Sequence, residues 1–432
     1  MANIEILDHA GKIIVDSILL TSSDGQKTLD IYGLFDEIEI FEDIYSASIY
    51  AKIQMIDGFN LKTNFPILGE EIITFTCHTP TISTKITKKF AVVGMSELSI
   101  GTAKKQVYSL DLISIEALID LHTKVYRAFT GTPSDSATQV FNTYFKPQTN
   151  AVLKADESSN TLKIVAPTVS PFKFMSMLAN KAIDKSPFGS PNFLFYEDNQ
   201  NYNFRNLSTL FGQDSLTTFR WSYNQLRDRD AQGKSTRDVK AEYANVKTLN
   251  IDRLFNTLDK AMAGSIGHRV IEVDILRKTV AKKTYSYTDN FKDTPHLNGY
   301  PTNSPTLYKS KNNDEVVEVS LIHSLHQDNF QLDRDGDVLT KRIPIINQNE
   351  FIKLDITTHG RTDLTVGNVV TFEMGKFETI DADKAMTTDA IDQYYSGKYL
   401  ITAIHHRISK AIHETTMEIV KESFNSKIGV QS

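Results

Sequence analysis

Three aspartates around one glycine are the first residues of this sequence whose spacing suggests chemistry. Asp333, Asp335 and Asp337 alternate about Gly336, and carboxylates at such spacing are typical of calcium-binding loops. An EF-hand loop needs its glycine at the sixth position and a bidentate glutamate at the twelfth. Counted from Asp333, neither requirement is met. We therefore interpret this stretch as a solvated turn.

Histidines form the second group that could do chemistry. His405 and His406 are adjacent on a predicted strand, so their side chains point to opposite faces and cannot both bind one metal without a bend. His413 follows the next turn and could approach one of them across the hairpin. His323 and His326 suit one face of a helix, but the sequence supplies no carboxylate partner for them. We predict structural roles for these histidines.

Recognisable catalytic and nucleotide-binding motifs are absent from the sequence. It has no P-loop, no nucleophile elbow and no dinucleotide-binding glycine pattern. The carboxylate pairs Glu70–Glu71 and Glu37/Glu39 are close in sequence only, which is typical of a solvated face. The small basic cluster Lys282–Lys283 suggests a strand edge guarded by lysines rather than a nucleic-acid site. We therefore predict no catalytic residue, no cofactor, no metal and no enzymatic activity.

Length and composition limit the class of protein. A chain of 432 residues is expected to form about three domains. The net charge of -6 is too mild to indicate nucleic-acid binding. Cys77 is the only cysteine, which excludes an intrachain disulfide and favours a cytosolic origin. Without a signal-peptide pattern or a long apolar run, we expect neither secretion by that route nor membrane insertion.

The elements that would position side chains are mainly strands. Residues 46–55 alternate between apolar and polar side chains, which is the period of a half-buried strand. Further strands are predicted at 71–77, from 89 and from 105, whereas 34–44 could be an edge strand or a short connection. Together these segments define a first β-domain over residues 1–118.

A similar pattern recurs near the C-terminus, over residues 340–432. Val366-Gly367 before VVTF resembles Leu68-Gly69 before EIITF, and Lys398-Tyr399 before LITAI resembles Lys89-Phe90 before AVVGM. We interpret this as one β-module used twice, although coincidence between strand-turn-strand patterns is the alternative.

The segment between the two modules has a different texture. Residues 119–219 are predicted to hold an inserted α+β domain. It has a helix that begins after the N-cap Thr132, a helix that begins at Ser170-Pro171, and a β-hairpin over 192–207. Residues 220–339 form a connecting region rich in strands and loops, with a predicted helix within 314–335. The fold class is thus mainly β with an α+β insertion.

Several of these segments together resemble a known family. They are IQMIDGFNLKTNFPILGEEIITF, NFLFYEDNQNYNFRNLSTL, VGNVVTFEM, GKYLITAIHHRI and TTMEIVKESF. The chain resembles the central baseplate hub protein of contractile-tailed bacteriophages, a hub fold shared with the N-terminal part of type VI secretion spike proteins. The resemblance covers nearly the whole chain in order and is one of layout, without a catalytic signature. The charged connections and the proline-rich loop have no match.

The resemblance implies a structure and a role. Each chain would supply two similar β-barrel tube domains, and a homotrimer would form a ring of pseudo-sixfold symmetry. The ring would adapt the sixfold tail tube or its initiator to a threefold central spike. The tape measure protein and the baseplate wedge would be further candidate partners, and phage DNA would pass through the lumen without specific binding. The protein would be made in the host cytoplasm and reside in the virion, with spike and lysozyme functions on partner chains.

Three alternatives remain open at this point. The chain could be the hub of a related contractile injection or type VI secretion machine, which neighbouring genes would distinguish. It could instead be an enzyme whose site is assembled from distant residues, which a deep pocket with convergent acids or histidines would favour. A different tail component with a single β-module would be favoured if the second copy failed.

Overall fold

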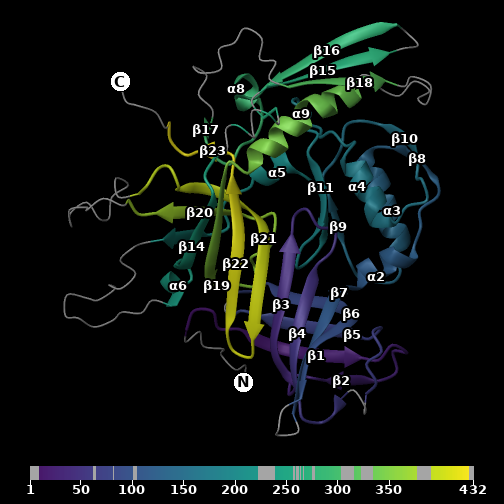
Figure 1. Cartoon of the computed structure of the whole chain (residues 1–432), viewed down its shortest axis with the longest axis vertical. Helices are drawn as coiled ribbons and strands as arrows, with labels where there is room; N and C mark the ends of the chain where they lie inside the picture. Colours follow the sequence, from purple (N-terminus) through teal and green to yellow (C-terminus); the bar gives the residue numbers. More distant parts are fainter. Residues whose placement is uncertain are drawn as a thin grey trace.

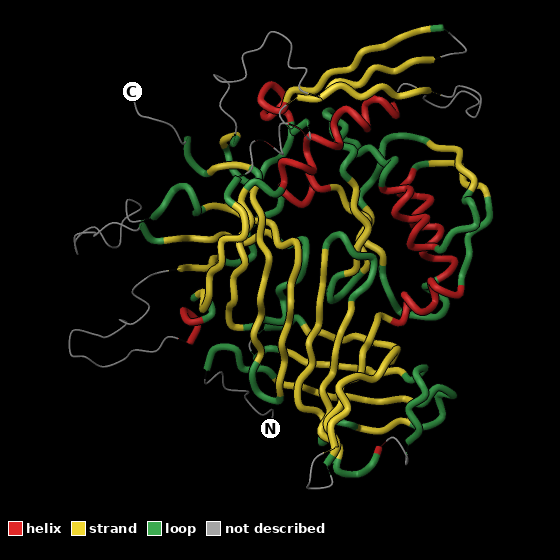
Figure 2. The backbone as a smooth tube through the Cα atoms, viewed as in Figure 1, coloured by secondary structure: helices red, strands yellow, loops and turns green. Residues whose placement is uncertain are grey.

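A computed structural model shows how these elements are arranged (Figure 1). The structure describes residues 9–61, 65–80, 82–100, 105–221, 239–255, 258, 262, 264–265, 267–274, 278–302, 316–322, 334–376 and 391–427. Strands dominate, and most helices lie at the upper right of the view, whereas α6 (Val239–Glu242) lies at the left (Figure 1 and Figure 2). The chain is mainly β with an α+β insertion, as the sequence predicted.

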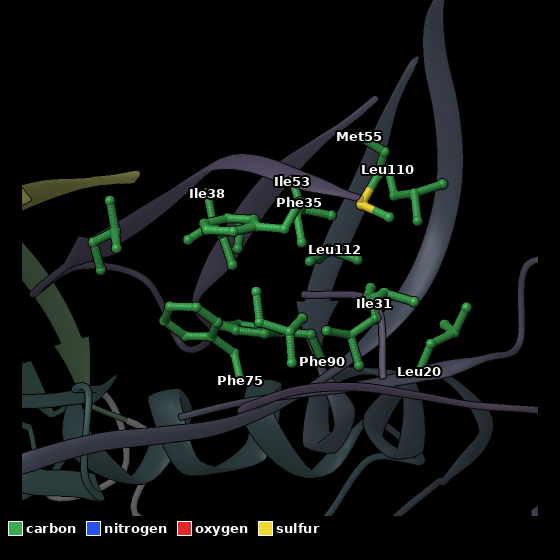
Figure 3. Close-up of a cluster of buried hydrophobic side chains, with 14 of the residues drawn as sticks. Leu20, Ile31, Phe35, Ile38, Ile53, Met55, Phe75, Phe90, Leu110 and Leu112 are labelled. Atoms are coloured by element: carbon green, nitrogen blue, oxygen red, sulfur yellow. The ribbon is translucent and has the colours of Figure 1, made fainter. Parts of the chain in front are cut away.

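The N-terminal strands form a coiled sheet around one core. They are β1 (Ile14–Thr21), β2 (Thr28–Asp30), β3 (Phe35–Asp43), β4 (Tyr50–Asp57), β5 (Ile72–His78), β6 (Lys85–Ile100) and β7 (Gln106–Ser114). In Figure 1, β1 and β5 lie across β3 and β4. Side chains from both directions meet between them, including Ile38, Ile53, Phe75 and Phe90 (Figure 3). Alternation along 46–55 predicted this burial, because Ile49, Ala51, Ile53 and Met55 are all fully buried.

The C-terminal strands form a second sheet region with its own core. They are β14 (Val246–Arg253), β19 (Ile352–His359), β20 (Val369–Met374), β21 (Gly397–Ser409) and β22 (His413–Lys421), with β13 (Thr218–Trp221) beside β20. The short strands β17 (Tyr300–Pro301) and β23 (Ser423–Phe424) pair nearby. Their core holds Phe372, Tyr399 and Ile419.

Both regions contain the same five-strand unit. The strand order is β3-β4-β7-β6-β5 in the first unit and β14-β19-β22-β21-β20 in the second. Register agrees as well, since Ile73 pairs with Phe90 where Val370 pairs with Tyr399. These four residues lie in the segments whose sequences resemble each other.

Irregularities of the strands repeat at matching places. The register shifts at Val92/Gly94 in β6, where it pairs with β7, and at Ile401/Ala403 in the equivalent strand β21, where it pairs with β22. It also shifts in the first strand of each unit, at Phe35/Glu37 in β3 and at Val246/Thr248 in β14. Bulges are specific local features, and matching pairs of them are not expected by chance. The interpretation of a module used twice is therefore supported over coincidence.

A third core belongs to the segment between the units. It contains α2 (Ile115–His122), β8 (Ala128–Gly131), α3 (Pro133–Tyr144), β9 (Leu153–Ala155), β10 (Leu162–Val165), α4 (Pro171–Ala179), β11 (Phe193–Glu197), β12 (Tyr202–Asn206) and α5 (Leu207–Phe211). The predicted helix starts are confirmed, since Thr132 Oγ1 accepts from Asp135 N and Pro171 opens α4. The predicted hairpin is β11–β12. The sequence analysis missed α2.

The predictions for residues 34–44 and for 314–335 were wrong, and in both cases pairing with a distant strand decided the structure. Residues 34–44 are neither an edge nor a connection, because β3 lies between β4 and β21 inside the sheet. The helix predicted within 314–335 is instead β18 (Val316–Ile322), which pairs in parallel with β15 (Gly267–Asp274). The helical spacing of its apolar residues was outweighed by this pairing.

The connecting region also holds β16 (Thr279–Ser286), α6 (Val239–Glu242), α8 (Tyr287–Asn290), a 3-10 turn η1 (Phe291–Asp293) and α9 (Arg334–Asn349). Strands β16, β15 and β18 form a three-stranded sheet in that order, so β16 is one of its edge strands. Lys282 and Lys283 therefore lie on a strand edge. Asp335 and Asp337 lie in α9 rather than in the solvated turn that we predicted, and Asp333 lies outside the described residues.

Candidate functional site: the junction of the two units and their free edges

The two units meet where β21 pairs with β3. This antiparallel contact runs from Ala403↔Asp43 to Ser409↔Glu37 and makes one continuous sheet from both units. We call this contact the junction. The side chain of His405 on β21 is half-buried, and its ring stacks on that of Phe41 on β3, with the two ring centroids 4.4 Å apart.

A buried carboxylate links the second unit to the first across the junction. Glu42 of β3 is almost fully buried, and its Oε2 accepts hydrogen bonds from Thr365 Oγ1 (2.5 Å) and from Val366 N (3.4 Å). Its Oε1 lies 3.3 Å from His406 Nε2. Hydrogen bonds to a charged acceptor are stronger than neutral ones, so this group fixes the loop before β20 to β3.

Two histidines extend this network. His406 Nδ1 and His413 Nε2 are 2.9 Å apart, and both rings are fully buried. Burial lowers the pKa of His413 well below its usual value, with a further contribution from the nearby His406. The sequence correctly predicted that His405 and His406 face opposite sides and that His413 can approach one of them.

The tip of the β11–β12 hairpin, residues 196–201, contacts both units. On the side of the first unit, Glu197 Oε1 lies 2.7 Å from Lys88 Nζ, in a buried ion pair. Its Oε2 accepts hydrogen bonds from Ile49 N (2.9 Å) and from the Ser114 hydroxyl. The inserted domain is thereby held to β4, β6 and β7.

On the side of the second unit, the hairpin tip contacts the loop before β20, residues 360–368. Asn199 Nδ2 donates to the carbonyl oxygen of Leu364 (3.1 Å), and Asn199 N donates to Thr365 Oγ1 (3.3 Å). Gly367 has a φ of 81°, and a Cβ there would lie 2.4 Å from Tyr196 Oη. Glycine is therefore required at this position for two reasons, the left-handed backbone and the close tyrosine.

Nothing in the sequence pointed to these contacts, because each joins residues far apart in the chain. The signal that was present is the alternation of β3, in which Glu42 occupies an inward position among Ile38, Ile40 and Ile44. An acid at an inward position is costly unless it is paired, so it marks a buried partner.

One face of the continuous sheet is polar across both units. Outward side chains of neighbouring strands pair along it, as shown by Arg407 Nε to Glu37 Oε1 (2.8 Å), Lys353 Nζ to Glu418 Oε2 (2.6 Å) and the Tyr50 hydroxyl to Asp111 Oδ1 (2.8 Å). We call this the polar face. Among the described residues of this face, acidic side chains outnumber lysine and arginine: Glu37, Glu39, Asp111, Asp252, Asp355, Glu414 and Glu418 against Lys52, Lys247, Lys353 and Arg407.

Strands β6 and β14 of the continuous sheet each have an unpaired stretch near exposed apolar residues. Beyond Val92, β6 pairs only with β7 among the described strands, and from residue 247 on β14 pairs only with β19. Near the β6 edge, Leu68 is 79% exposed and Met95 is 37% exposed; next to the β14 edge, Phe255 is 61% exposed. An unpaired strand edge flanked by apolar side chains is a template for pairing with another chain.

The remaining residues that the sequence suggested for chemistry are not brought together. His323 and His326 lie outside the described residues. Cys77 is buried, which raises the pKa of its thiol. Glu71 does not act with Glu70, since its carboxylate accepts from the backbone of Leu68 and Gly69. Among the described residues, no group of three or more histidine, cysteine or acidic side chains could hold a metal ion.

Within the part of the chain that the structure describes, no helix is both long and apolar enough to cross a lipid bilayer.

Comparison with solved structures identifies the fold. A tail protein from Neisseria meningitidis matches with a TM-score of 0.52 and 12% identity, covering 94% of this chain and 96% of that one. The 43 kDa tail protein of prophage MuSo2 from Shewanella oneidensis matches with a TM-score of 0.53 and 11% identity, covering 94% and 98%. An Escherichia coli component of the type VI secretion system matches at a TM-score of 0.44 and 10% identity, covering 98% and 80%.

The chain has the fold of these phage tail proteins, and the resemblance to a baseplate hub is confirmed at the level of the fold. No known protein family and no curated protein sequence matches the chain.

Proposed function

We propose that this protein is the structural hub of a phage tail baseplate, a homotrimeric ring of pseudo-sixfold symmetry. The observation that carries the proposal is a repeated five-strand unit in which one copy of the junction is made inside the chain and the other is left open. Three chains supply six units, so a ring of three presents six similar surfaces to a sixfold tail tube and three to a spike.

The junction inside the chain indicates how the ring closes. Strand β21 of the second unit pairs with β3 of the first, and the equivalent strands are β6 and β14. Both of these strands have an unpaired stretch among the described residues. Strand β6 of one chain would therefore pair with β14 of the next, in a heterologous contact that closes after three steps of a third of a turn.

Equivalent register gives the residues of this contact. Ser99 corresponds to Arg407 and Asn250 corresponds to Glu39, because each has the same partner on the neighbouring strand of its unit. Since Arg407 pairs with Glu39, Ser99 of one chain would lie opposite Asn250 of the next. The exposed Leu68, Met95 and Phe255 would be covered in the same step, within an interface of roughly 2,000 Å² or more.

The polar face would line the lumen of the ring. Its excess of carboxylates would repel the phosphates of DNA, so that DNA would pass without binding. The absence of a basic stripe on this face supports passage rather than recognition. The proposed partners are the central spike, the tail tube or its initiator, the tape measure protein and the baseplate wedge, and the proposed location is the virion. We propose no enzymatic activity.

Cysteine cross-linking tests the ring contact. The double variant Ser99→Cys/Asn250→Cys, oxidised under mild conditions, should form covalent dimers and trimers between chains. The native Cys77 should stay unreacted because it is buried. Each single variant is a control, and Ser99→Cys/Asp252→Cys is a matched pair on the same edges but out of register. Equal yields from the two double variants, or monomers only at assembly concentrations, would refute the proposed contact.

A further inference from the structure

The histidine pair at the junction has a hydrogen-bonding arrangement that limits its protons. Only one hydrogen fits between His406 Nδ1 and His413 Nε2 at 2.9 Å. His406 Nε2 lies 3.3 Å from Glu42 Oε1, but neither atom completes a hydrogen bond, and Thr415 Oγ1 lies 3.3 Å from both His406 Nδ1 and His413 Nε2. The other ring nitrogen of His413, Nδ1, has no hydrogen-bond partner among the described residues.

The position of the His413 ring is tightly restricted. A Cβ on Gly360 would lie 2.2 Å from His413 Cγ, so the ring rests directly on the backbone of that loop. Backbone bonds hold it from both sides, with His413 N donating to Gly11 O (2.7 Å) and Gly360 N donating to His413 O (2.8 Å). The ring therefore cannot turn away if its charge changes.

We propose that this His406–His413–Glu42 network makes the junction the acid-sensitive joint of the chain. A second proton on the buried His413 ring gives it a positive charge and leaves its Nδ1–H without an acceptor, in a ring that cannot move. Opening the junction relieves this charge by exposing His413 to water, whereas neither five-strand unit has to unfold. The proposal concerns the contact inside one chain and stands independently of ring assembly.

Other ionisable groups near the network would either favour or oppose opening of the junction at low pH. Burial lowers the pKa of His405 on β21 and of His359 on β19, so protonation of these two histidines would favour opening, as protonation of His413 does. Glu39 faces His405 across the junction from β3, and Arg407 lies near His405 on β21 itself. On the hairpin tip, Tyr196 and Asp198 face Glu42; burial raises the pKa of both, and protonation of Asp198 at lower pH would act against opening.

The sign of the effect follows from linkage. The pKa of His413 is lower in the folded chain than its unfolded value of about 6.5, so the unfolded or opened form binds the proton more tightly. The stability contributed by the neutral ring is complete above about pH 6.5 and falls as the pH drops below it. One proton changes the opening constant by up to about tenfold per pH unit.

Hydrogen exchange of the full-length chain at pH 7.5 and pH 5.5, corrected for the intrinsic rate, measures this opening. Amides of β3 and of residues 360–368 should exchange about tenfold faster at pH 5.5, while those of β5, inside the first unit, should not. Equal changes in β3 and β5 would overturn the proposal, and this comparison needs no variant.

A substitution identifies the group. His413→Gln keeps an amide donor near the position of Nε2 and cannot take up a proton, so it should remove most of the pH response of β3. His122→Gln, at an exposed position on α2, is the matched control and should retain the full response. A folded His413→Gln variant with an unchanged response would also overturn the proposal.

Discussion

The same loop has opposite surroundings in the two units. Val366 and Leu68 both precede a glycine with positive φ at the entrance to an equivalent strand, yet Val366 is 1% exposed and Leu68 is 79% exposed. Val366 is covered because the first unit lies against the second at the junction. Leu68 has no such neighbour within the described chain. This difference supports the proposed ring, in which the chain makes one copy of a repeated contact and a second molecule would supply the other.

The backbone amides of the two loops also differ in whether their hydrogen-bond acceptor belongs to the same unit or to the other unit. In the second unit, the amide of Val366 is bonded to Glu42, which belongs to the first unit. In the first unit, the amides of Leu68 and Gly69 are bonded to Glu71 of the same loop. The first unit can therefore hold its loop in the free chain, whereas the second unit depends on its neighbour. This is the arrangement expected of a chain that folds first and assembles afterwards.

The largest expected effect separates folding from assembly. Val366→Asp should destabilise the chain by about 3–5 kcal/mol or more, because it buries a carboxylate without a cation. Leu68→Asp should change the free energy of unfolding by less than about 0.5 kcal/mol but prevent ring formation. Chemical denaturation and light scattering measure the two quantities. If Leu68→Asp assembled normally, the two loops would not be equivalent in the way proposed here.

Glu197→Ala should break the contact between the inserted domain and the first unit. The change leaves Lys88 buried without its partner, and breaking a buried ion pair costs about 3–5 kcal/mol. Glu157→Ala is the control, since Glu157 pairs with Lys185 at the surface, where such pairs contribute about 0–1 kcal/mol. Urea denaturation of both variants gives the comparison, and similar losses would argue against a special role of the hairpin tip.

Alanine substitutions at the two loop glycines should lower the stability by smaller and unequal amounts. Gly69→Ala should cost about 1–2 kcal/mol, because its φ of 103° is strained for alanine while its Cβ would meet open space. Gly367→Ala should cost about 2–5 kcal/mol, because its Cβ would also collide with Tyr196. The double variant Gly367→Ala/Tyr196→Phe should recover part of the loss. Equal costs at the two glycines would show that the tyrosine contact is unimportant.

The smallest effect is expected on the polar face. Gln54→Glu lies on the polar side of β4, between buried Ile53 and Met55, and should change stability by no more than about 0.5 kcal/mol while leaving assembly intact. Ile53→Asp, one residue away on the buried side, should prevent folding. Thermal unfolding of the two variants would be enough, and similar behaviour would mean that the face is wrongly assigned.

Local patterns predicted much of the fold but little of the junction. Alternation along 46–55 and the N-cap at Thr132 predicted their elements because the responsible forces act between near neighbours in sequence. The repeat of Leu68-Gly69 in Val366-Gly367 revealed the second unit for the same reason. By contrast, the place of β3 in the middle of the sheet depends on pairing with β21, more than 350 residues later. The roles of Glu42 and Glu197 depend on partners far away in the chain, which the sequence alone does not identify.

The most direct test of the account is an electron cryomicroscopy reconstruction of the ring within an assembled tail tip. It should contain three copies of this chain, with β6 of each copy paired to β14 of the next, Leu68 and Phe255 buried between them, and the polar face toward the lumen. Six copies, a single copy, or three copies with the edges of β6 and β14 apart would contradict it.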